Sequence, residues 1–278
     1  MTSIAYPAEQ LVEALAPVDA PRLPQTVEVD CPIVFVIPAF NEEDNIPRLF
    51  ADLERRPQLF PEHSRVFVVD DGSSDRTAEL VEYYDGNLPV ELVKLERNQG
   101  PGAAFRAGFG QALLSTPGEA YIVTLEADTT SDLDALPTML AEAHAGAELV
   151  LASWTMVNVS RKRKLLSKGA SFIFRSALGI EAETVSSFFR VYRASTLRKS
   201  FAHYGSDLMR ERGFACKAEL LANIARLGAR IVEVPVDLDS DRRVGKSKMP
   251  IFKTIVAYLR MLARQRRAGA DAVLREAT

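Results

Sequence analysis

Short continuous apolar runs alternate along this chain with longer stretches in which apolar residues recur every three or four positions. The short runs, typical of strands buried on both faces, lie at 33–37, 65–69, 90–95, 121–125 and 148–153. The longer stretches, which predict amphipathic helices, lie at 45–56, 74–84, 103–114 and 133–145. Strands that alternate with helices of this length form βαβ crossovers. The pattern therefore predicts an α/β fold with a mostly parallel sheet flanked by helices.

Polar residues gather where the predicted strands end. They occupy residues 38–42, 70–75, 97–102 and 126–130. In parallel sheets, ligands bind at the carboxyl ends of the strands. We therefore expect the active site at this edge of the sheet.

Three segments of the chain differ in character. Residues 1–30 are rich in proline and acidic residues and predict a loose extension, whereas residues 31–248 form one α/β domain. Residues 249–267, within a tail that ends at 278, combine apolar side chains at helical spacing with many cations, and residues 161–178 repeat this pattern. A C-terminal amphipathic helix of this kind suits the surface of an anionic membrane. The alternative is that these helices pack on the core or on a partner subunit of a homo-oligomer.

The overall charge and composition limit the cellular locations and the binding partners that we expect for this protein. There are 34 Lys and Arg residues against 37 Asp and Glu, so the basic segments stand out from an acidic body. Beyond Phe252 and Tyr258 they lack interleaved aromatic residues, and they match no recognised nucleic-acid-binding module, so we expect no nucleic-acid partner. Two cysteines and no long apolar run favour a cytoplasmic protein, peripheral at the cytoplasmic face of the membrane.

Two acidic motifs follow predicted strands. Asp70 and Asp71 can accept hydrogen bonds from a base and from ribose hydroxyls, and Gly72 allows a sharp turn. Glu126 and Asp128, with Ala127 between them, offer the carboxylate oxygens that Mg²⁺ and Mn²⁺ prefer. For each motif the alternative is a capped, solvated turn.

The segment 97–102 leads into a predicted helix. Its glycines let backbone approach a ligand, and a helix N-terminus favours phosphate. A dinucleotide fingerprint is rejected, because Phe105 stands where its third glycine belongs and the segment follows the third strand.

Together, the motifs at 38–42, 69–75, 98–100 and 126–128 resemble those of family 2 glycosyltransferases with a GT-A (Rossmann-like) fold. The segments 187–193, 213–219, 231–236 and 243–248 are similar to the branch of dolichol-phosphate mannose synthase and other polyprenyl-phosphate glycosyltransferases. This resemblance runs from about Pro32 to Met249. It implies a metal-dependent hexosyltransferase that moves a sugar from a GDP- or UDP-linked donor to polyprenyl or dolichyl phosphate, with inversion.

The resemblance also implies roles for particular residues. Glu126 and Asp128 would hold Mg²⁺ or Mn²⁺. The nucleotide-sugar donor would be bound by Pro38, Phe40, Glu42, Asp70, Asp71, Arg97, Gly100 and Ala127. The catalytic set would be Asp128, Arg190, Glu219, Arg243 and Lys248, the cations holding phosphate or pyrophosphate. A structural ion pair is the alternative for Arg190 and Glu219.

Several positions depart from the family pattern. They are Phe40 for Tyr, Glu126 for the first Asp of the metal motif, Thr130 for Gln, Thr184 for an acid, Phe188 for a small residue and Lys217 for Gln. Because the later ones surround the expected acceptor side, two alternatives stay open. One is the same fold acting on a soluble small-molecule acceptor, and the other is a catalytically weakened nucleotide-sugar-binding protein.

Overall fold

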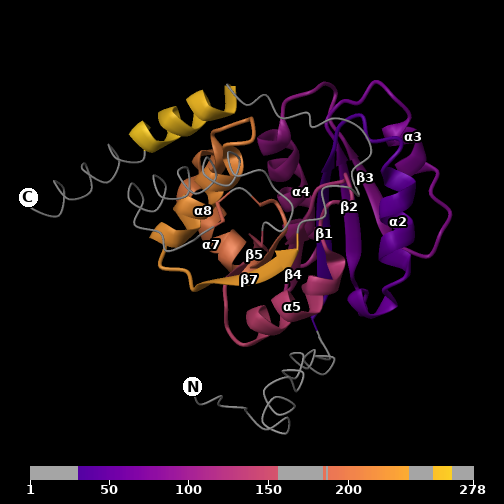
Figure 1. Cartoon of the computed structure of the whole chain (residues 1–278), viewed down its shortest axis with the longest axis horizontal. Coiled ribbons are helices and arrows are strands. Elements are labelled where there is room, and N and C mark those ends of the chain that lie inside the picture. The colour runs from indigo at the N-terminus through magenta and orange to yellow at the C-terminus, as the bar shows by residue number, and fades with distance from the viewer. Residues whose placement is uncertain (1–30, 156–183, 186, 238–252, 265–278) are drawn as a thin grey trace, which may run out of the picture.

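A computed structural model describes residues 31–155, 184–185, 187–237 and 253–264 (Figure 1). The expectations for the N-terminal extension, for the basic segment at 161–178 and for Arg243 and Lys248 concern residues outside this part of the chain.

The sheet has seven strands in the order β3-β2-β1-β4-β6-β5-β7. Their bounds are β1 Ile33–Ala39, β2 Arg65–Asp70, β3 Val90–Lys94, β4 Tyr121–Thr124, β5 Leu149–Thr155, β6 Arg190–Arg193 and β7 Ile231–Asp237. β6 runs antiparallel to both β4 and β5, and every other pairing is parallel. The prediction of a mostly parallel sheet is confirmed.

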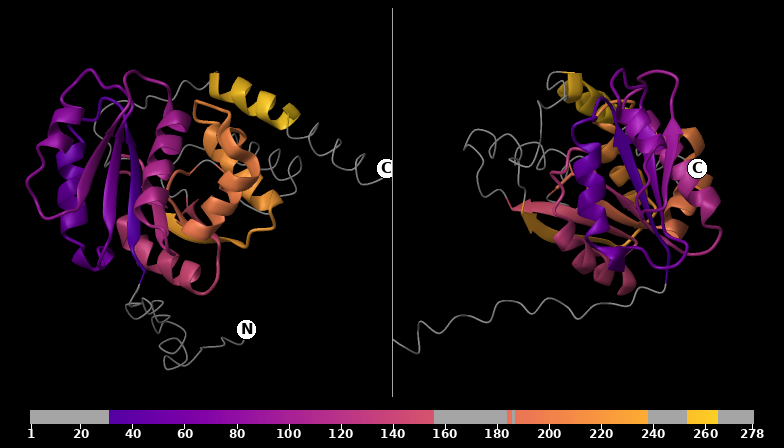
Figure 2. Two further views of the ribbon diagram at one scale, coloured as in Figure 1. Left: turned by 180° about the vertical axis from the view of Figure 1, so that it is seen from behind. Right: turned by 90° about the vertical axis from the view of Figure 1, so that its right-hand side faces the viewer.

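Helices cover both faces of this sheet (Figure 2). They are α2 Ile46–Glu54, α3 Thr77–Glu82, α4 Pro101–Ser115, α5 Leu136–His144, α7 Ala194–Tyr204 and α8 Cys216–Arg226, with short 3-10 turns at Pro57–Leu59, Leu133–Ala135 and Gly205–Met209. A further helix spans residues 253–264 and is drawn in yellow in Figure 1. No helix in the described ranges is long and apolar enough to cross a membrane.

Alternate residues of β1 enter two separate cores. Val34 and Val36 pack with α4, α7 and α8 on one face, and Ile33, Phe35 and Ile37 pack with α2 and α5 on the other. Because successive side chains of a strand point to opposite faces, a strand covered on both sides must be apolar throughout. This explains the continuous apolar runs in the sequence.

The helix at 253–264 belongs to the first of these cores. Met261 and Leu262 are buried against it, and Tyr258 packs partly on it. Three further apolar side chains of the same helix, Ile255, Val256 and Leu259, are exposed.

The helix expected at 74–84 begins later than predicted, and its N-cap is Arg76, which makes no side-chain capping hydrogen bond. Asp75 accepts hydrogen bonds from the backbone N–H of Thr77 (3.0 Å) and from its hydroxyl (2.5 Å). The carboxylate thus closes a turn ahead of α3, which starts at Thr77.

Candidate active site

Two loops meet at the carboxyl edge of the sheet. Ala39, the last residue of β1, pairs with Asp70, the last residue of β2. The backbone N–H of Asn41 donates to the Ser73 hydroxyl (2.9 Å), and the Ser74 N–H donates to the Asn41 side-chain oxygen (2.8 Å). Asn41 has φ 54°, a conformation that asparagine tolerates better than most residues. The two polar motifs predicted to bind a nucleotide therefore form one connected edge.

The adjacent carboxylates of Asp70 and Asp71 have different surroundings. Asp70 is fully buried; its Oδ1 accepts from the Ser73 N–H (3.1 Å), while its Oδ2 is buried without a hydrogen-bond partner. Both oxygens of Asp71 are engaged, accepting from the backbone N–H groups of Gln99 (2.7 Å) and Gly100 (2.8 Å). Burial raises the pKa of Asp71, an effect that these two hydrogen bonds oppose. Asp71 thus holds the 98–100 loop, and Asp70 retains an unused acceptor.

The glycines at the start of α4 accommodate the chain itself. Gly100 has φ +88°, and an added Cβ there would lie 2.5 Å from the carbonyl oxygen of Arg212. A Cβ on Gly102 would come within 3.0 Å of the Glu211 carbonyl oxygen, and the Gly102 N–H donates to the Arg212 carbonyl (2.7 Å). The segment 211–212 therefore covers this helix N-terminus. The expectation that these glycines admit a ligand backbone and that the helix end binds phosphate has no support here.

Glu126 and Asp128 follow β4 at the same edge of the sheet. Asp128 is buried, and its Oδ1 accepts from the N–H (3.1 Å) and the hydroxyl (2.6 Å) of Thr130. Thr129, which lies between Asp128 and Thr130, has φ 61°, so the turn is tight. The two carboxylates supply hard oxygen donors, which fit Mg²⁺ or Mn²⁺.

Lys217 on α8 carries a buried ammonium. Its ammonium sits 4.0 Å from the centroid of the Phe188 ring and 5.6 Å from that of Phe214. Burial lowers the pKa of Lys217 to about 8, against the opposing effect of the negative charges of Glu126 and Asp128. Lys217, Phe188 and Thr124 also line one small cavity.

Arg190, expected to hold phosphate, is bound to the backbone. It is buried in β6, and its guanidinium donates to the carbonyls of Lys217 (2.8 Å) and Val185 (3.2 Å) and to the Tyr192 hydroxyl (3.4 Å). Its Nε is buried without a partner. The guanidinium of Arg190 thus ties β6 to the start of α8.

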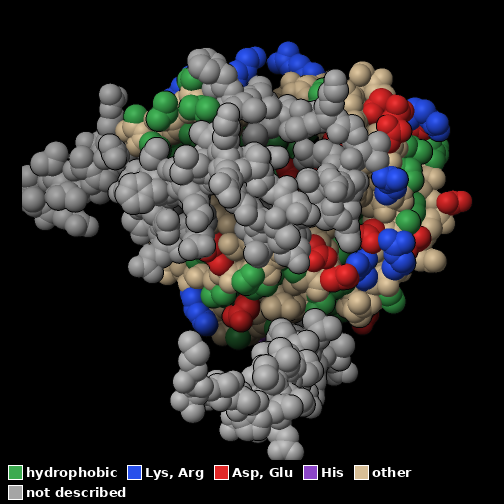
Figure 3. Space-filling model, viewed as in Figure 1, with side chains coloured by type: hydrophobic (Ala, Val, Ile, Leu, Met, Phe, Trp, Pro, Cys, Tyr) green, Lys and Arg blue, Asp and Glu red, His purple; other side chains and the backbone are tan. Residues whose placement is uncertain are grey.

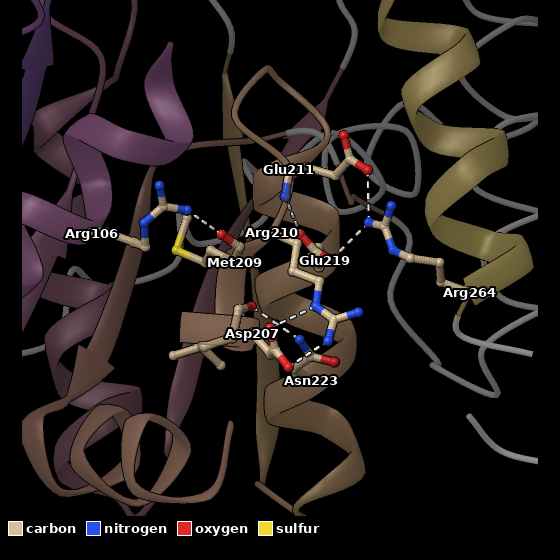
Figure 4. A network of polar contacts seen from close by, with 9 residues as sticks. Arg106, Asp207, Met209, Arg210, Glu211, Glu219, Asn223 and Arg264 are labelled. Atoms are coloured by element: carbon tan, nitrogen blue, oxygen red, sulfur yellow. Dashed lines mark hydrogen bonds and ion pairs between the residues drawn. The ribbon is translucent and has the colours of Figure 1, made fainter. Parts of the chain in front are cut away.

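Glu219 forms an ion pair, but its partner is Arg264 in the C-terminal helix. Arg264 donates to Glu219 Oε1 (3.0 Å) and to Glu211 Oε1 (2.7 Å), and Glu219 Oε2 accepts from the Glu211 backbone N–H (2.7 Å) (Figure 4). The alternative of an Arg190–Glu219 pair is therefore replaced by an Arg264–Glu219–Glu211 network. This network fixes the segment that covers the start of α4.

Of the other predicted residues, those that the structure describes lie around the same edge. Pro38 and Phe40 are half-buried at the end of β1, and the Glu42 carboxylate accepts from the Asn45 side chain (2.6 Å). Arg97 is exposed, whereas the Ala127 side chain packs in the core. Arg243 and Lys248 lie outside the described residues.

Two contributors were not predicted as site residues. Arg264 was grouped only with the cations of an amphipathic helix, and Glu211 carried no signal. Arg264 lies 45 positions from Glu219 and 53 positions from Glu211 in the sequence. No local pattern could have found that pairing.

The comparisons with known proteins give the class of the protein. Among solved structures, a similar one is glucosyl-3-phosphoglycerate synthase from Mycobacterium tuberculosis in complex with Mn²⁺, uridine diphosphate and phosphoglyceric acid. It matches with a TM-score of 0.63 and 18% identity, covering 85% of this chain and 78% of that one. The fold is that of the GT-A glycosyltransferases, as predicted.

The family follows from the sequence comparison. The family model described as glycosyl transferase family 2 matches residues 34–203, and this chain belongs to that family. The undecaprenyl-phosphate mannosyltransferase of Micrococcus luteus is 33% identical over 78% of this chain and 87% of its own length. The polyprenol monophosphomannose synthase of Mycolicibacterium smegmatis is 29% identical over 81% of this chain and 84% of its own length. These matches confirm the prediction of an enzyme of the hexosyltransferase type.

Proposed function

We propose that this enzyme transfers a hexose from a nucleotide sugar to a polyprenyl phosphate, with a divalent metal and with inversion at the anomeric carbon. The observation that carries the proposal is the meeting of Asp70 and the Glu126–Asp128 pair at one edge of a GT-A sheet. The polyprenyl-phosphate acceptor is supported by the names of relatives that match about four-fifths of the chain.

The nucleotide is held by the edge that β1 and β2 form. Asp70 Oδ2 is a buried acceptor without a partner, which suits an N–H group of the base. Asp71 acts indirectly, because its carboxylate fixes the loop that follows β3. Pro38, Phe40, Glu42 and Arg97 surround the same edge and complete the donor site.

Glu126 and Asp128 are the residues that would hold Mg²⁺ or Mn²⁺ through their carboxylate oxygens. When bound, the metal supplies positive charge where the departing diphosphate gains negative charge. Thr130 orients Asp128 by donating two hydrogen bonds to the same oxygen.

The transfer itself is a direct displacement. An oxygen of the acceptor phosphate forms a bond to the anomeric carbon as the bond from that carbon to the donor diphosphate breaks, and the leaving group departs with the electron pair. Attack from the face opposite the leaving group inverts the configuration. Because a phosphate acceptor is already anionic, no general base has to remove a proton from it.

The C-terminal helix brings the enzyme to a lipid-borne acceptor. Ile255, Val256 and Leu259 are exposed on residues 253–264, with Lys253 and Arg260 exposed beside them. Hydrophobic side chains gather over this helix in Figure 3. Apolar anchors flanked by cations suit an anionic membrane surface, here the cytoplasmic one.

The departures near the expected acceptor side favour a second candidate, transfer to a soluble acceptor. Thr184 replaces an acid, and its N–H donates to Glu233 (2.8 Å). Phe188 adds bulk beside Lys217. A soluble-acceptor enzyme would hydrolyse or use nucleotide sugars without forming a lipid product.

The test of the proposal is the Asp128→Asn variant in a transfer assay with UDP- and GDP-sugars, Mn²⁺ and polyprenyl phosphate in detergent. We expect a loss of about 100-fold or more, since an amide lacks the charge that a metal ligand supplies. Asp132→Asn is the matched control, because Asp132 caps the following 3-10 turn. Unchanged lipid-linked product in Asp128→Asn would exclude the metal-site role.

A further inference from the structure

Arg264 joins the C-terminal helix to a buried carboxylate that the proposed function does not use. Its guanidinium donates to Oε1 of Glu219 (3.0 Å) and to Oε1 of Glu211 (2.7 Å), and the Glu219 side chain is only 2% exposed. A buried carboxylate is unfavourable unless a cation or hydrogen-bond donors lie close to it. Arg264 and Glu219 therefore hold each other in the arrangement that Figure 4 shows.

The segment that carries Glu211 is held by three helices. From α8, the Glu219 carboxylate accepts from the Glu211 backbone N–H (2.7 Å). From α4, the Arg106 guanidinium donates to the Met209 carbonyl. From the C-terminal helix, Arg264 binds the Glu211 side chain. The position of this segment thus depends in part on a residue of the C-terminal helix.

Backbone contacts connect this segment to the loop before α4. The Arg212 carbonyl accepts from the Gly102 N–H (2.7 Å), and a Cβ on Gly100 would lie 2.5 Å from the same carbonyl oxygen. The Gly100 N–H in turn donates to the Asp71 carboxylate (2.8 Å). The loop that Asp71 binds therefore lies directly against the segment 211–212.

The same loop packs against the turn that follows β2. A Cβ on Gly72, whose φ is +69°, would lie 2.5 Å from the backbone of Arg97 and 2.7 Å from that of Asn98. This turn begins at Asp70, whose Oδ2 is the buried acceptor that we assign to the base. Because close-packed backbone transmits displacements, a shift of the segment 211–212 would reach the donor site.

We propose that Arg264 is a positioning residue of the donor site. From the C-terminal helix it holds the segment 211–212 against the start of α4, and this contact keeps Asp70 and Asp71 in the geometry that binds the nucleotide. The inference rests on the proposed function, since it takes this edge of the sheet as the nucleotide site. Without Arg264, part of the binding free energy would go into ordering the segment, so the affinity falls. The donor site is accordingly complete only with the helix at 253–264 docked on the core.

The test is a calorimetric titration of the full chain with UDP and with GDP, each in the presence of Mn²⁺. We expect Arg264→Gln to raise the Kd of the nucleotide that binds about fivefold or more. Arg264→Lys, which keeps a cation beside the two carboxylates, should recover most of the affinity. A purely structural role would lower the stability in urea and leave the Kd of the folded protein unchanged.

A double variant tests whether Arg264 acts through Glu219. Arg264→Gln/Glu219→Gln should bind the nucleotide no more weakly than Arg264→Gln, because both substitutions remove the same contact. It also removes the unpaired buried carboxylate, so its Kd gives the same test if Arg264→Gln does not fold. A further fivefold weakening in the double variant would show that the two residues act independently and would overturn the inference.

Arg198→Gln is the matched control. Arg198 donates to the carbonyls of Thr116 and Gly118, which follow the other end of α4, and its loss should leave the nucleotide Kd unchanged. An equal rise of the Kd in Arg198→Gln would assign the effect to general destabilisation and overturn the inference. A wild-type Kd in Arg264→Gln, with native circular dichroism, would overturn the inference and leave the proposed function intact. A wild-type enzyme that binds neither UDP nor GDP would overturn the donor site of the proposed function as well.

Discussion

Replacing Gly102 by alanine tests whether the start of α4 is reserved for the segment 211–212. The added Cβ would lie within 3.0 Å of the Glu211 carbonyl oxygen, a backbone atom that cannot rotate away as a side chain could. The segment must therefore move. The hydrogen bond from the Gly102 N–H to Arg212 would be lost, at a cost of about 0.5–1.5 kcal/mol.

The displacement also weakens the network behind that segment. The Glu211 N–H donates to the Glu219 carboxylate, and a hydrogen bond to a charged group contributes about 1.5–3 kcal/mol. Together these losses predict that Gly102→Ala lowers the free energy of unfolding by about 2–4.5 kcal/mol. With an m-value of about 3 kcal/mol/M, the urea midpoint measured by circular dichroism should fall by about 1 M.

Gly110 in the same helix is the matched control. A Cβ there meets nothing within 4 Å, and the residue is exposed. Because alanine favours helix over glycine, Gly110→Ala should stabilise the fold by about 0.5–1 kcal/mol. If Gly102→Ala were as stable as Gly110→Ala, the reasoning from close packing would be refuted.

Three further predictions concern the edge of the sheet and the C-terminal helix. Arg264→Gln removes two ion pairs and should lower the free energy of unfolding, measured in urea, by about 1–2 kcal/mol; the loss is modest because solvent screens the partly exposed Arg264. Arg260→Gln, at an exposed position, is the control, and equal stability of the two variants would contradict the network. Asp70→Asn should weaken nucleotide binding about tenfold in calorimetry while the exposed Asp85→Asn does not, and equal affinities would remove Asp70 from the donor site. Ile255→Glu/Leu259→Glu should abolish co-sedimentation with anionic vesicles while leaving the circular dichroism unchanged, and retained co-sedimentation would place the membrane contact elsewhere.

The parts of the fold that follow from local sequence were predictable. The run Ile33–Ile37 is apolar because β1 lies between two strands with a core on each face, and such a run identifies a strand without any tertiary knowledge. The acidic residues after β2 and β4 could be placed at one edge for the same reason, since parallel strands end on the same side.

β6 could not be predicted as an antiparallel strand. Its apolar Val191 and Tyr192 lie between two arginines, a pattern too short to show a period. Its direction depends on pairing with β4 and β5, which lie far from it in the sequence. Such pairings are set by tertiary packing.

The roles of single residues in the site also depended on distant contacts. Asp70 and Asp71 are identical in type and adjacent, yet only the contact of Asp71 with Gln99 and Gly100 separates their roles. In the same way, the glycines of α4 could not be assigned before the position of Arg212 was known. The motifs that form the site were therefore predictable from the sequence, whereas the role of each residue within a motif was not.

The most direct test of the central claim is the transfer reaction of the wild-type enzyme with polyprenyl phosphate in detergent. UDP- and GDP-sugars are each supplied with Mg²⁺ or Mn²⁺, and the lipid fraction is analysed for attached sugar. The account predicts a lipid-linked hexose that forms with one of these donors and disappears when EDTA removes the metal. Nucleotide-sugar turnover without any lipid product, or lipid product that persists in EDTA, would contradict it.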